Sequence, residues 1–531
     1  MLARRFPGWC RTTLNTFQQY SSAAAPKSKF AAATQPISHA TKQGGKHKSH
    51  KLPDDPYLLS NKVSRLITTG KHDEAMDLVK NAPIRLQSEV VWNQLISGQA
   101  SQGKCNGAFK TLNEMKRRGF NPNEHTFTNL MTALAKNPSE SSVARANDLY
   151  VTMQESGSIT KIHFNALLNV YARCGAHREM MRLFDAMLES DVSPDKVTYS
   201  TLFNAFARQQ IGTFEEIVTI WEKAQEQMAV LNKDKRPTSL RVDDKLMASF
   251  LNAVTNTGTL AKHYHMGLAA FDECYGLRIS RRGRNPKLLD EDRTILSPTA
   301  VSFRSVLLLL NKARKFGLAN EYIDELYGKI KPDTPALNAI IAIRYSEQKY
   351  SDAIDYLKKM QELGLRPNAS SFDMFIRSCG KLYSGRDAKD PMVWQKLSMV
   401  LNQHASEVRR RYKQGIPDKD LQLSSRSCVE IMRITRASVS AAPSLDDKRE
   451  MYETALRSVE SQRWRTAAKK VSSEKHALLA QWVAAGYEFL LNNTFEKRTP
   501  SREDRLEWEK SLSLAQQALP RSRGREDSRD R

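Results

Sequence analysis

The chain has 531 residues, which is too long for one compact core and predicts several domains or an extended array of stacked units. Its 82 lysines and arginines outnumber 58 acidic residues, and the formal charge of +24 makes a polyanion or an anionic membrane surface the natural partner. The longest apolar stretches, such as 306–310, are much shorter than the roughly 20 residues of a membrane-spanning helix, so nucleic acid is favoured over membrane.

Residues 1–53 contain many basic residues but no acidic one, and Ser, Thr, Ala and Gln are frequent among them. Within residues 1–18 apolar side chains alternate with arginines, as in a basic amphipathic helix, although Pro7 and Gly8 would interrupt it. This composition is typical of a mitochondrial transit peptide followed by a basic disordered arm, so we expect the mature protein in the mitochondrial matrix. The alternative is a basic tail on a cytosolic or nuclear protein that binds nucleic acid, and the cleavage site stays open.

A seven-residue motif with an aromatic or apolar residue at its third position recurs at intervals of about 35 residues, the spacing of a helical repeat. The motif occupies residues 90–96, 125–131, 162–168, 197–203, 301–307, 335–341 and 370–376.

The second half of each repeat places a small residue and a methionine seven positions apart, as in Ala108 and Met115, so that both lie on one helical face. Gly119 and Pro122 then follow, and such residues end a helix. Each repeat therefore predicts a helix-turn-helix hairpin, and stacked hairpins predict an all-α solenoid.

The motif divides the chain into six predicted segments. The array is expected in two groups, with a helical extension after them that includes helices at 445–459 and 473–491. The tail is so dense in charge that we expect it to be disordered. The segments are a transit peptide and basic arm (1–53), a first repeat group that diverges at both ends (54–275), a basic linker (276–299), a second repeat group (300–380), a C-terminal helical extension (381–499) and a charged disordered tail (500–531).

These repeats resemble the pentatricopeptide repeat family, whose motif opens with V-T-Y-N-x-L-I, continues with A-x-x-x-F-x-x-M and closes with G-x-x-P-D. Residues 197–203 and 193–195 come very near the opening and the close. The resemblance implies that the first helices line a concave face and bind single-stranded RNA, with one base met by two or three side chains of each repeat. The overall plan is similar to fungal mitochondrial factors that mature the 5′ end of the small-subunit (15S) rRNA.

The resemblance also assigns two base-reading positions to each repeat. The first position falls on Asn93, Thr128, Asn165, Ser200 and Asn338. The second position, the last residue of the repeat, falls on Asn123, Thr160, Asp195, Asp333 and Asn368.

By the same resemblance, Asn165 with Asp195 would prefer uracil, whereas the two Asn–Asn pairs would prefer a pyrimidine. Thr128 with Thr160 matches no clear rule. Ala248, Arg304 and Asp373 occupy the first position in the remaining repeats and depart from the pattern, so those repeats are expected to hold phosphate or only to pack.

Apolar residues just before the aromatic position would wedge between bases, and basic clusters would hold phosphates. For each polar or basic residue, an ordinary exposed position on a helix is the alternative. The base-sandwiching candidates are Val90, Ile162, Val197 and Val301. The phosphate candidates are Lys116, Arg117, Arg118, Arg281, Arg282 and Arg284, and Arg409–Arg411 form a further basic cluster.

The sequence shows no catalytic signature, so we expect a binding protein without a cofactor. A zinc deaminase would need His-x-Glu and Cys-x-x-Cys, and neither occurs. The six cysteines are scattered without metal-binding spacing, and neither a P-loop nor a nucleophile elbow is found. His263 and His265 lie two apart on an expected helix and therefore do not face the same way.

The leading hypothesis is a sequence-selective RNA-binding protein that acts in mitochondrial RNA maturation, stability or translation, and more specifically in 5′-end processing of the small-subunit rRNA. Its partners would be single-stranded mitochondrial RNA, as an rRNA precursor or an mRNA, and the mitochondrial small ribosomal subunit during its maturation. Two alternatives stay open: a structural or assembly-associated subunit of the mitochondrial ribosome, and a protein-binding helical scaffold.

Overall fold

The computed structural model describes residues 55–155, 159–190, 192–209, 212–233, 242–256, 260–277, 279–280, 296–384, 391–416, 418–460, 474–495 and 499–519. Within these ranges every regular element is a helix, which confirms the predicted all-α class. None of the helices described is both long and apolar enough to cross a bilayer. The predicted transit peptide and basic arm lie outside the described residues.

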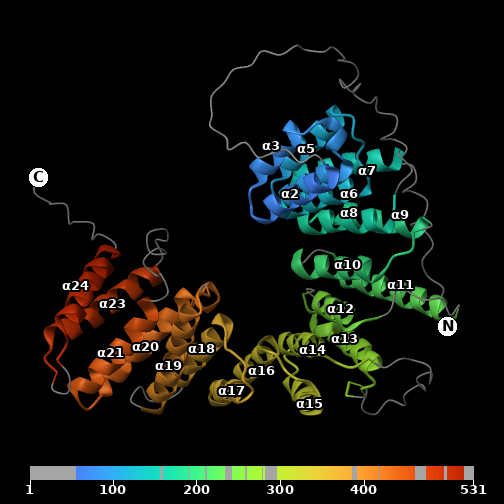
Figure 1. The fold of residues 1–531 in the computed structure, drawn as a ribbon. Helices are drawn as coiled ribbons and strands as arrows, with labels where there is room; N and C mark the ends of the chain where they lie inside the picture. Colours follow the sequence, from blue (N-terminus) through green and yellow to red (C-terminus); the bar gives the residue numbers. More distant parts are fainter. Residues whose placement is uncertain are drawn as a thin grey trace, which may run out of the picture. The chain divides into compact units, whose positions relative to one another are not determined.

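The helices form consecutive hairpins, each made of a first and a second helix that pack against each other (Figure 1). The first helices are α2 (Pro56–Thr68), α4 (Glu89–Ser101), α6 (Glu124–Lys136), α8 (Lys161–Cys174), α10 (Lys196–Gln209), α12 (Asp244–Asn256), α14 (Ala300–Lys312), α16 (Thr334–Ser346), α18 (Ala369–Ser384), α20 (Ser425–Ala441) and α23 (Glu474–Asn492). The second helices are α3 (His72–Asn81), α5 (Cys105–Arg117), α7 (Glu140–Glu155), α9 (His177–Glu189), α11 (Phe214–Lys233), α13 (Leu260–Tyr275), α15 (Phe316–Leu326), α17 (Tyr350–Glu362), α19 (Pro391–Lys413), α21 (Leu445–Glu460) and α24 (Arg502–Gln517). Two short 3-10 turns, η1 (Ile84–Leu86) and η2 (Asp418–Leu421), lie in connections.

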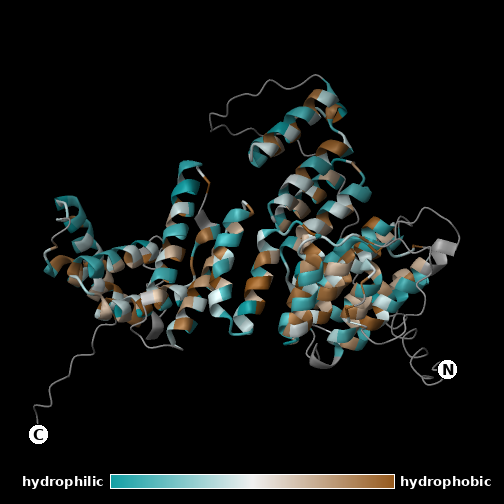
Figure 2. Ribbon diagram, turned by 90° about the horizontal axis from the view of Figure 1, so that it is seen from below, coloured by the Kyte–Doolittle hydropathy of each residue, from teal (hydrophilic) through white to brown (hydrophobic). Residues whose placement is uncertain are grey.

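Each first helix also packs against the first helix of the next hairpin, from α2 on α4 to α20 on α23. The apolar residues lie along the sides on which neighbouring helices meet (Figure 2). In the first helices these include the large residue at the third position of the seven-residue motif. Three such residues, Trp92, Tyr199 and Phe303, are fully buried. Because every hairpin buries its apolar sides against its neighbours, the predicted α-solenoid is confirmed.

The second helices end where the glycine and proline signals predict. Ala108 and Met115 of α5 are fully buried, as expected of residues on the inner face. Gly119 then adopts a φ of 84°, in the left-handed region that favours glycine, and the amide of Phe120 donates to the carbonyl of Met115 over 3.1 Å. This bond spans five residues, as in the usual glycine-terminated helix end, and it turns the chain toward the next repeat.

The predicted linker at 276–299 does not divide the array, because α12 packs against α10 on one side and α14 on the other. The chain that leaves α13 and the chain that enters α14 are held together at Asp244. Its Oδ1 accepts from the hydroxyl of Tyr275 over 2.7 Å and from the amide of Thr299 over 3.3 Å. Leu296 donates to the carbonyl of Cys274 over 3.0 Å. The stack of helices therefore continues from α12 and α13 to α14.

The prediction that the tail is disordered from residue 500 is wrong for α24. Ser501 caps this helix, and Asp504 completes a capping box with it. Ser511 and Ala515 are buried, because α24 packs against α23. The high charge density of the tail concealed this narrow apolar face. The predicted helices at 445–459 and 473–491 match α21 and α23 within one or two residues.

His404 of α19 is buried against η2, in the connection that leads to α20, and we expect acid to weaken the packing there. Its Nε2 lies 3.0 Å from the carbonyl oxygen of Leu421, and burial lowers the pKa of the imidazole. The unfolded chain therefore binds a proton more readily than the folded one, and the stability contributed by neutral His404 is lost as the pH falls below about 6.5.

We expect the urea midpoint of the wild-type protein to fall more between pH 7 and pH 5.5 than that of His404→Gln, which cannot titrate. Circular dichroism at both pH values measures the difference. An equal fall in both proteins would show that protonation of His404 does not weaken the fold.

Candidate RNA-binding edge

The last residue of many repeats is also the N-cap residue of the next first helix, where its side chain binds exposed backbone amides. Asn123 caps α6, and its Oδ1 accepts from the amide of Thr126 over 3.2 Å. Asp195 accepts in the same way from the amides of Val197 and Thr198, over 2.9 and 3.0 Å. Short polar side chains are preferred there because they satisfy amides that the helix leaves unpaired. We call the N-cap residues and the fifth residues of the first helices the cap edge.

In three repeats the two predicted base-reading residues are in direct contact. The carboxamide Nδ2 of an asparagine at the fifth position donates to the side-chain oxygen of the following N-cap residue. The pairs are Asn93 with Asn123 at 2.9 Å, Asn165 with Asp195 at 3.3 Å, and Asn338 with Asn368 at 3.2 Å.

A hydroxyl that the sequence analysis did not single out completes each of these pairs. It belongs to the third residue of the next first helix and donates to Oδ1 of the asparagine. The donors are Thr126 to Asn93 at 2.6 Å, Thr198 to Asn165 at 2.7 Å, and Ser371 to Asn338 at 2.7 Å. The threonine of the V-T-Y-N motif was the available signal, because it recurs with the asparagine. We call each group of three residues a cap triad.

The triads fix how the asparagine amides point. Oδ1 accepts from the hydroxyl, so Nδ2 is turned toward the N-cap oxygen and uses one of its two N–H groups there. Asn165 and Asn338 are half-buried, whereas Asn93 is only 9% exposed. The second N–H of each amide has no acceptor among the described residues. A fixed donor with one unused proton is suited to a hydrogen bond with an external acceptor.

Other repeats do not form this triad. Thr128 donates to the carbonyl of Glu124 in its own helix. Thr160 forms a capping box with His163. The predicted pair Thr128 and Thr160 is therefore not joined by a hydrogen bond. Ser200 is half-buried, and no hydrogen bond links it to Asp243, the residue that caps α12.

The three repeats that depart from the pattern also differ from one another in structure. Ala248 is buried, and Arg304 is half-buried next to a helix, α16, that Asp333 caps. Asp373 accepts from the amide of Ser424 over 3.1 Å, and Ser424 caps α20. The cap edge thus continues past the last repeat that the motif marked.

The four base-sandwiching candidates are exposed, although aliphatic residues usually lie in the core. They occupy the second position of their first helices, one turn before the fifth position. Their exposed fractions lie between 43% and 62%: Val90, Ile162, Val197 and Val301. Aliphatic side chains at the same exposed position of four repeats are consistent with contact to a flat ligand.

The basic cluster at the end of α5 is partly engaged within the protein. Arg117 and Arg118 each lie 2.8 Å from Oε1 of Glu114, and the hydrogen bond from Arg117 lowers the pKa of that carboxyl. Arg118 also donates to the carbonyl of Lys80 over 3.1 Å. Lys116 is exposed, so it is the member of this cluster best placed for a phosphate. Arg281, Arg282 and Arg284 lie outside the described residues.

Possible metal ligands in the described part do not cluster, and two of its thiols are buried. In the described ranges, no three His, Cys, Asp or Glu side chains come together as metal ligands would. Burial raises the pKa of Cys379 and of Cys428 to about 12, so both thiols stay protonated near neutral pH.

The comparison with family models identifies the repeats. Residues 87–136 and 160–208 match a model described as the PPR repeat family, and residues 327–382 match the pentatricopeptide repeat domain. These segments contain all three cap triads in full.

Curated relatives carry the same repeats. A mitochondrial pentatricopeptide repeat-containing protein of Arabidopsis thaliana is 22% identical over 335 residues, which cover 59% of this chain and 48% of the relative. The mitochondrial pentatricopeptide repeat-containing protein 1 of Rattus norvegicus is 26% identical over 188 residues, 34% of this chain and 26% of the relative. The matched part thus spans about half of these relatives or less.

Among solved structures, the pentatricopeptide repeat protein PPR10, crystallised with an 18-nucleotide psaJ RNA element, superposes with a TM-score of 0.50 at 17% identity. The match covers 87% of this chain and 56% of that one, and it shows a shared fold. The matched models, the helical hairpins and the stacking of those hairpins together show that this chain contains pentatricopeptide repeats at residues 87–136, 160–208 and 327–382.

Proposed function

We propose that this protein binds single-stranded RNA along its cap edge and selects among RNA sequences there. The observation that carries the proposal is the cap triad, which recurs at Asn93, Asn165 and Asn338 with the same donors and acceptors. Amides held in one orientation distinguish the donors and acceptors of a base without burying a charge. By the family resemblance, the triad closed by Asp195 selects uracil and the other two select a pyrimidine.

Three further observations support RNA as the ligand. The four exposed aliphatic residues can lie against base faces, and two of them, Val90 and Ile162, stand one turn before a triad asparagine. The formal charge of +24 favours a polyanion. The protein PPR10, which shares the fold, was crystallised with an RNA element.

We place the activity in the mitochondrion, in the matrix, because residues 1–53 have the composition of a transit peptide and several relatives are named as mitochondrial. The role proposed there is RNA maturation, stability or translation, and the specific step is 5′-end processing of the small-subunit rRNA during maturation of the small ribosomal subunit. In this role the chain itself catalyses no step, and it occupies a single-stranded stretch that guides or blocks processing.

Crosslinking in mitochondria followed by sequencing of the bound RNA tests this role. One short pyrimidine-rich footprint at a precursor end is the expected result. Stoichiometric co-sedimentation with mature ribosomal subunits would instead assign the protein to the ribosome as a structural subunit. Recovery of no RNA would overturn both assignments and leave a protein-binding scaffold.

A random RNA pool tests the base-reading assignment directly. Asn165→Ala should lose the preference for uracil at one position, and discrimination there should fall by about 1–2 kcal/mol, the scale of a hydrogen bond. Asn402→Ala, an exposed asparagine on α19, serves as the control and should keep the wild-type preferences. If the sequences selected by Asn165→Ala equal those of the wild type, Asn165 does not read a base.

A further inference from the structure

The second helix α19 is long, and its end projects beyond the cap edge. The ring of His404 in α19 lies 4.9 Å from the ring of Phe372, which is near the start of α18. The two helices form an antiparallel hairpin, and α19 continues to Lys413 whereas α18 begins at Ala369. With a rise of 1.5 Å per residue, the end of α19 passes the start of α18 by roughly 9 Å. We call residues 408–416 the α19 overhang.

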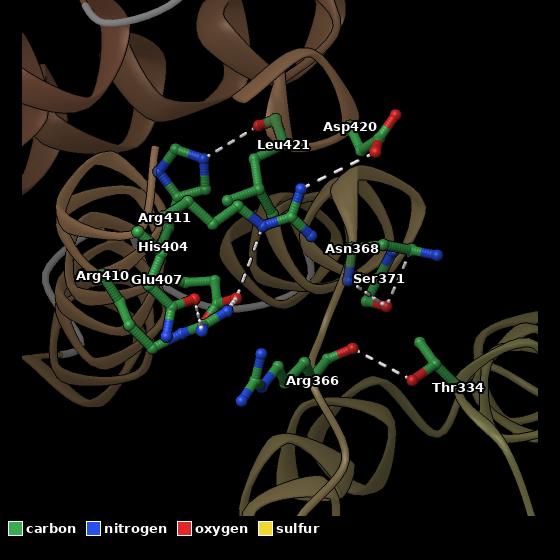
Figure 3. Close-up of polar contacts among 11 residues, drawn as sticks. Thr334, Arg366, Asn368, Ser371, His404, Glu407, Arg410, Arg411, Asp420 and Leu421 are labelled. Atoms are coloured by element: carbon green, nitrogen blue, oxygen red, sulfur yellow. Dashed lines mark hydrogen bonds and ion pairs between the residues drawn. The ribbon is translucent and has the colours of Figure 1, made fainter. Parts of the chain in front are cut away.

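The overhang lies beside the last triad. Asn368 and Ser371, which belong to that triad, stand at the start of α18, and Asp373 one turn later binds the cap of α20. Figure 3 shows this start of α18 together with the arginines at the end of α19. A strand that follows the cap edge from α16 to α20 therefore has to pass the overhang.

Two of the overhang's arginines are used to hold it in place. Arg410 donates to both carboxylate oxygens of Glu407, over 2.9 and 2.5 Å, and Arg411 lies 3.5 Å from the same carboxylate (Figure 3). Glu407 is only 7% exposed, and the hydrogen bond from Arg410 lowers its pKa. Gly415, with a φ of 65°, then ends the helix, and the amide of Ile416 donates to the carbonyl of Arg411 over 3.1 Å.

The other side chains of the overhang face solvent around a hollow. Arg409 and Lys413, one turn apart, have no ion-pair partner among the described residues, and both are exposed. Tyr412 is 86% exposed. These three residues, with Val408 and Ile416, line a cavity of about 300 Å³. An exposed aromatic ring between two unpaired cations offers a stacking face for a base and charges for the flanking phosphates.

We propose that the α19 overhang is a second RNA-binding surface, on which Tyr412 stacks with one base and Arg409 and Lys413 hold the neighbouring phosphates. The surface has no sequence preference, because every base has a face that can stack. The RNA strand held at the triads would continue onto this surface, so the inference rests on the proposed function. The pair of cations without nearby acidic partners favours RNA over a protein as the occupant.

Fluorescence anisotropy with labelled oligouridine of about 20 nucleotides, at several salt concentrations, tests the surface in the full-length protein. Tyr412→Ala should weaken binding about tenfold without changing the salt dependence, since the loss of one stacked base costs that much. The double variant Arg409→Ala/Lys413→Ala should weaken binding and lower the slope of log K against log salt by about 1.4, or 0.7 for each lost phosphate contact. Oligonucleotides shortened from either end should abolish both effects once they no longer reach the overhang.

The matched control is Arg178→Ala/Lys358→Ala, which removes two exposed cations from α9 and α17 and should keep the wild-type slope. Thermal melts verify that all variants fold. If the wild type binds and both overhang variants bind equally well with the same slope, the surface is overturned while the proposed function stands. A change of oligomeric state in Tyr412→Ala without a change in RNA affinity would assign the surface to a protein contact. If the wild type binds no RNA, both proposals fail.

Discussion

Trp92→Ala is expected to lower the free energy of unfolding of the first hairpins by about 3–5 kcal/mol, the usual cost of deleting a buried large aromatic side chain. Trp92 is fully buried in α4, and its ring centroid lies 6.3 Å from that of Phe120 in the next turn. The guanidinium of Arg118 stacks 5.7 Å from the same ring. The substitution therefore removes contacts with both the second helix and the loop that leads to α6.

The damage should stay local, because each hairpin of a solenoid contacts only its neighbours. Hydrogen exchange read by mass spectrometry should show faster exchange in α2 to α6 and wild-type exchange in α16 to α20. Val151→Ala, at a position 50% exposed on α7, is the control and should change stability by less than about 0.5 kcal/mol. Uniformly faster exchange along the chain would mean that the array unfolds as one unit.

Thr198→Val is expected to impair base selection without touching a base. The hydroxyl of Thr198 is fully buried, donates to Oδ1 of Asn165 over 2.7 Å and accepts from the amide of Asp195 over 3.1 Å. Valine keeps the shape of the side chain but has no hydroxyl. Oδ1 of Asn165 and the amide of Asp195 therefore lose a hydrogen-bond partner, at a cost of about 1–3 kcal/mol in stability. The amide of Asn165 then loses the contact that sets its orientation.

The expected RNA result is a loss of preference at the same position that Asn165→Ala affects, with little change elsewhere. Thr198→Ser keeps the hydroxyl and should restore the preference, so the pair of variants separates orientation from a general loss of fold. Selection from a random RNA pool measures both. A wild-type preference in Thr198→Val would show that Asn165 is oriented by the RNA and not by the triad.

The repeats could be predicted from sequence because each hairpin is specified by local signals. The glycine and proline after Met115 end a helix wherever they occur, and the fully buried Ala108 and Met115 mark one face by spacing alone. The candidate reading residues followed from the motif, and the structure brings three of the four predicted pairs into contact.

The remaining features depend on contacts between residues far apart in the chain. Asp244 binds Thr299 across the basic insertion, so the charge of that segment wrongly indicated a boundary in the array. The helix α24 was missed because its acidic and basic residues outnumber the few apolar residues that meet α23. The overhang followed from no motif, since only the position of His404 beside Phe372 shows where α19 extends.

The capping role of the last residue in each repeat has a consequence for how this protein could change its RNA target. That residue begins the next helix, and only a few residue types do so without a loss of about 1 kcal/mol. Across the array the position holds Asn123, Thr160, Asp195, Asp243, Thr299, Asp333, Asn368 and Ser424, all of them good caps. Substitutions at this position are therefore restricted to the few residue types that can begin a helix. A new RNA target is reached by replacing one capping residue with another.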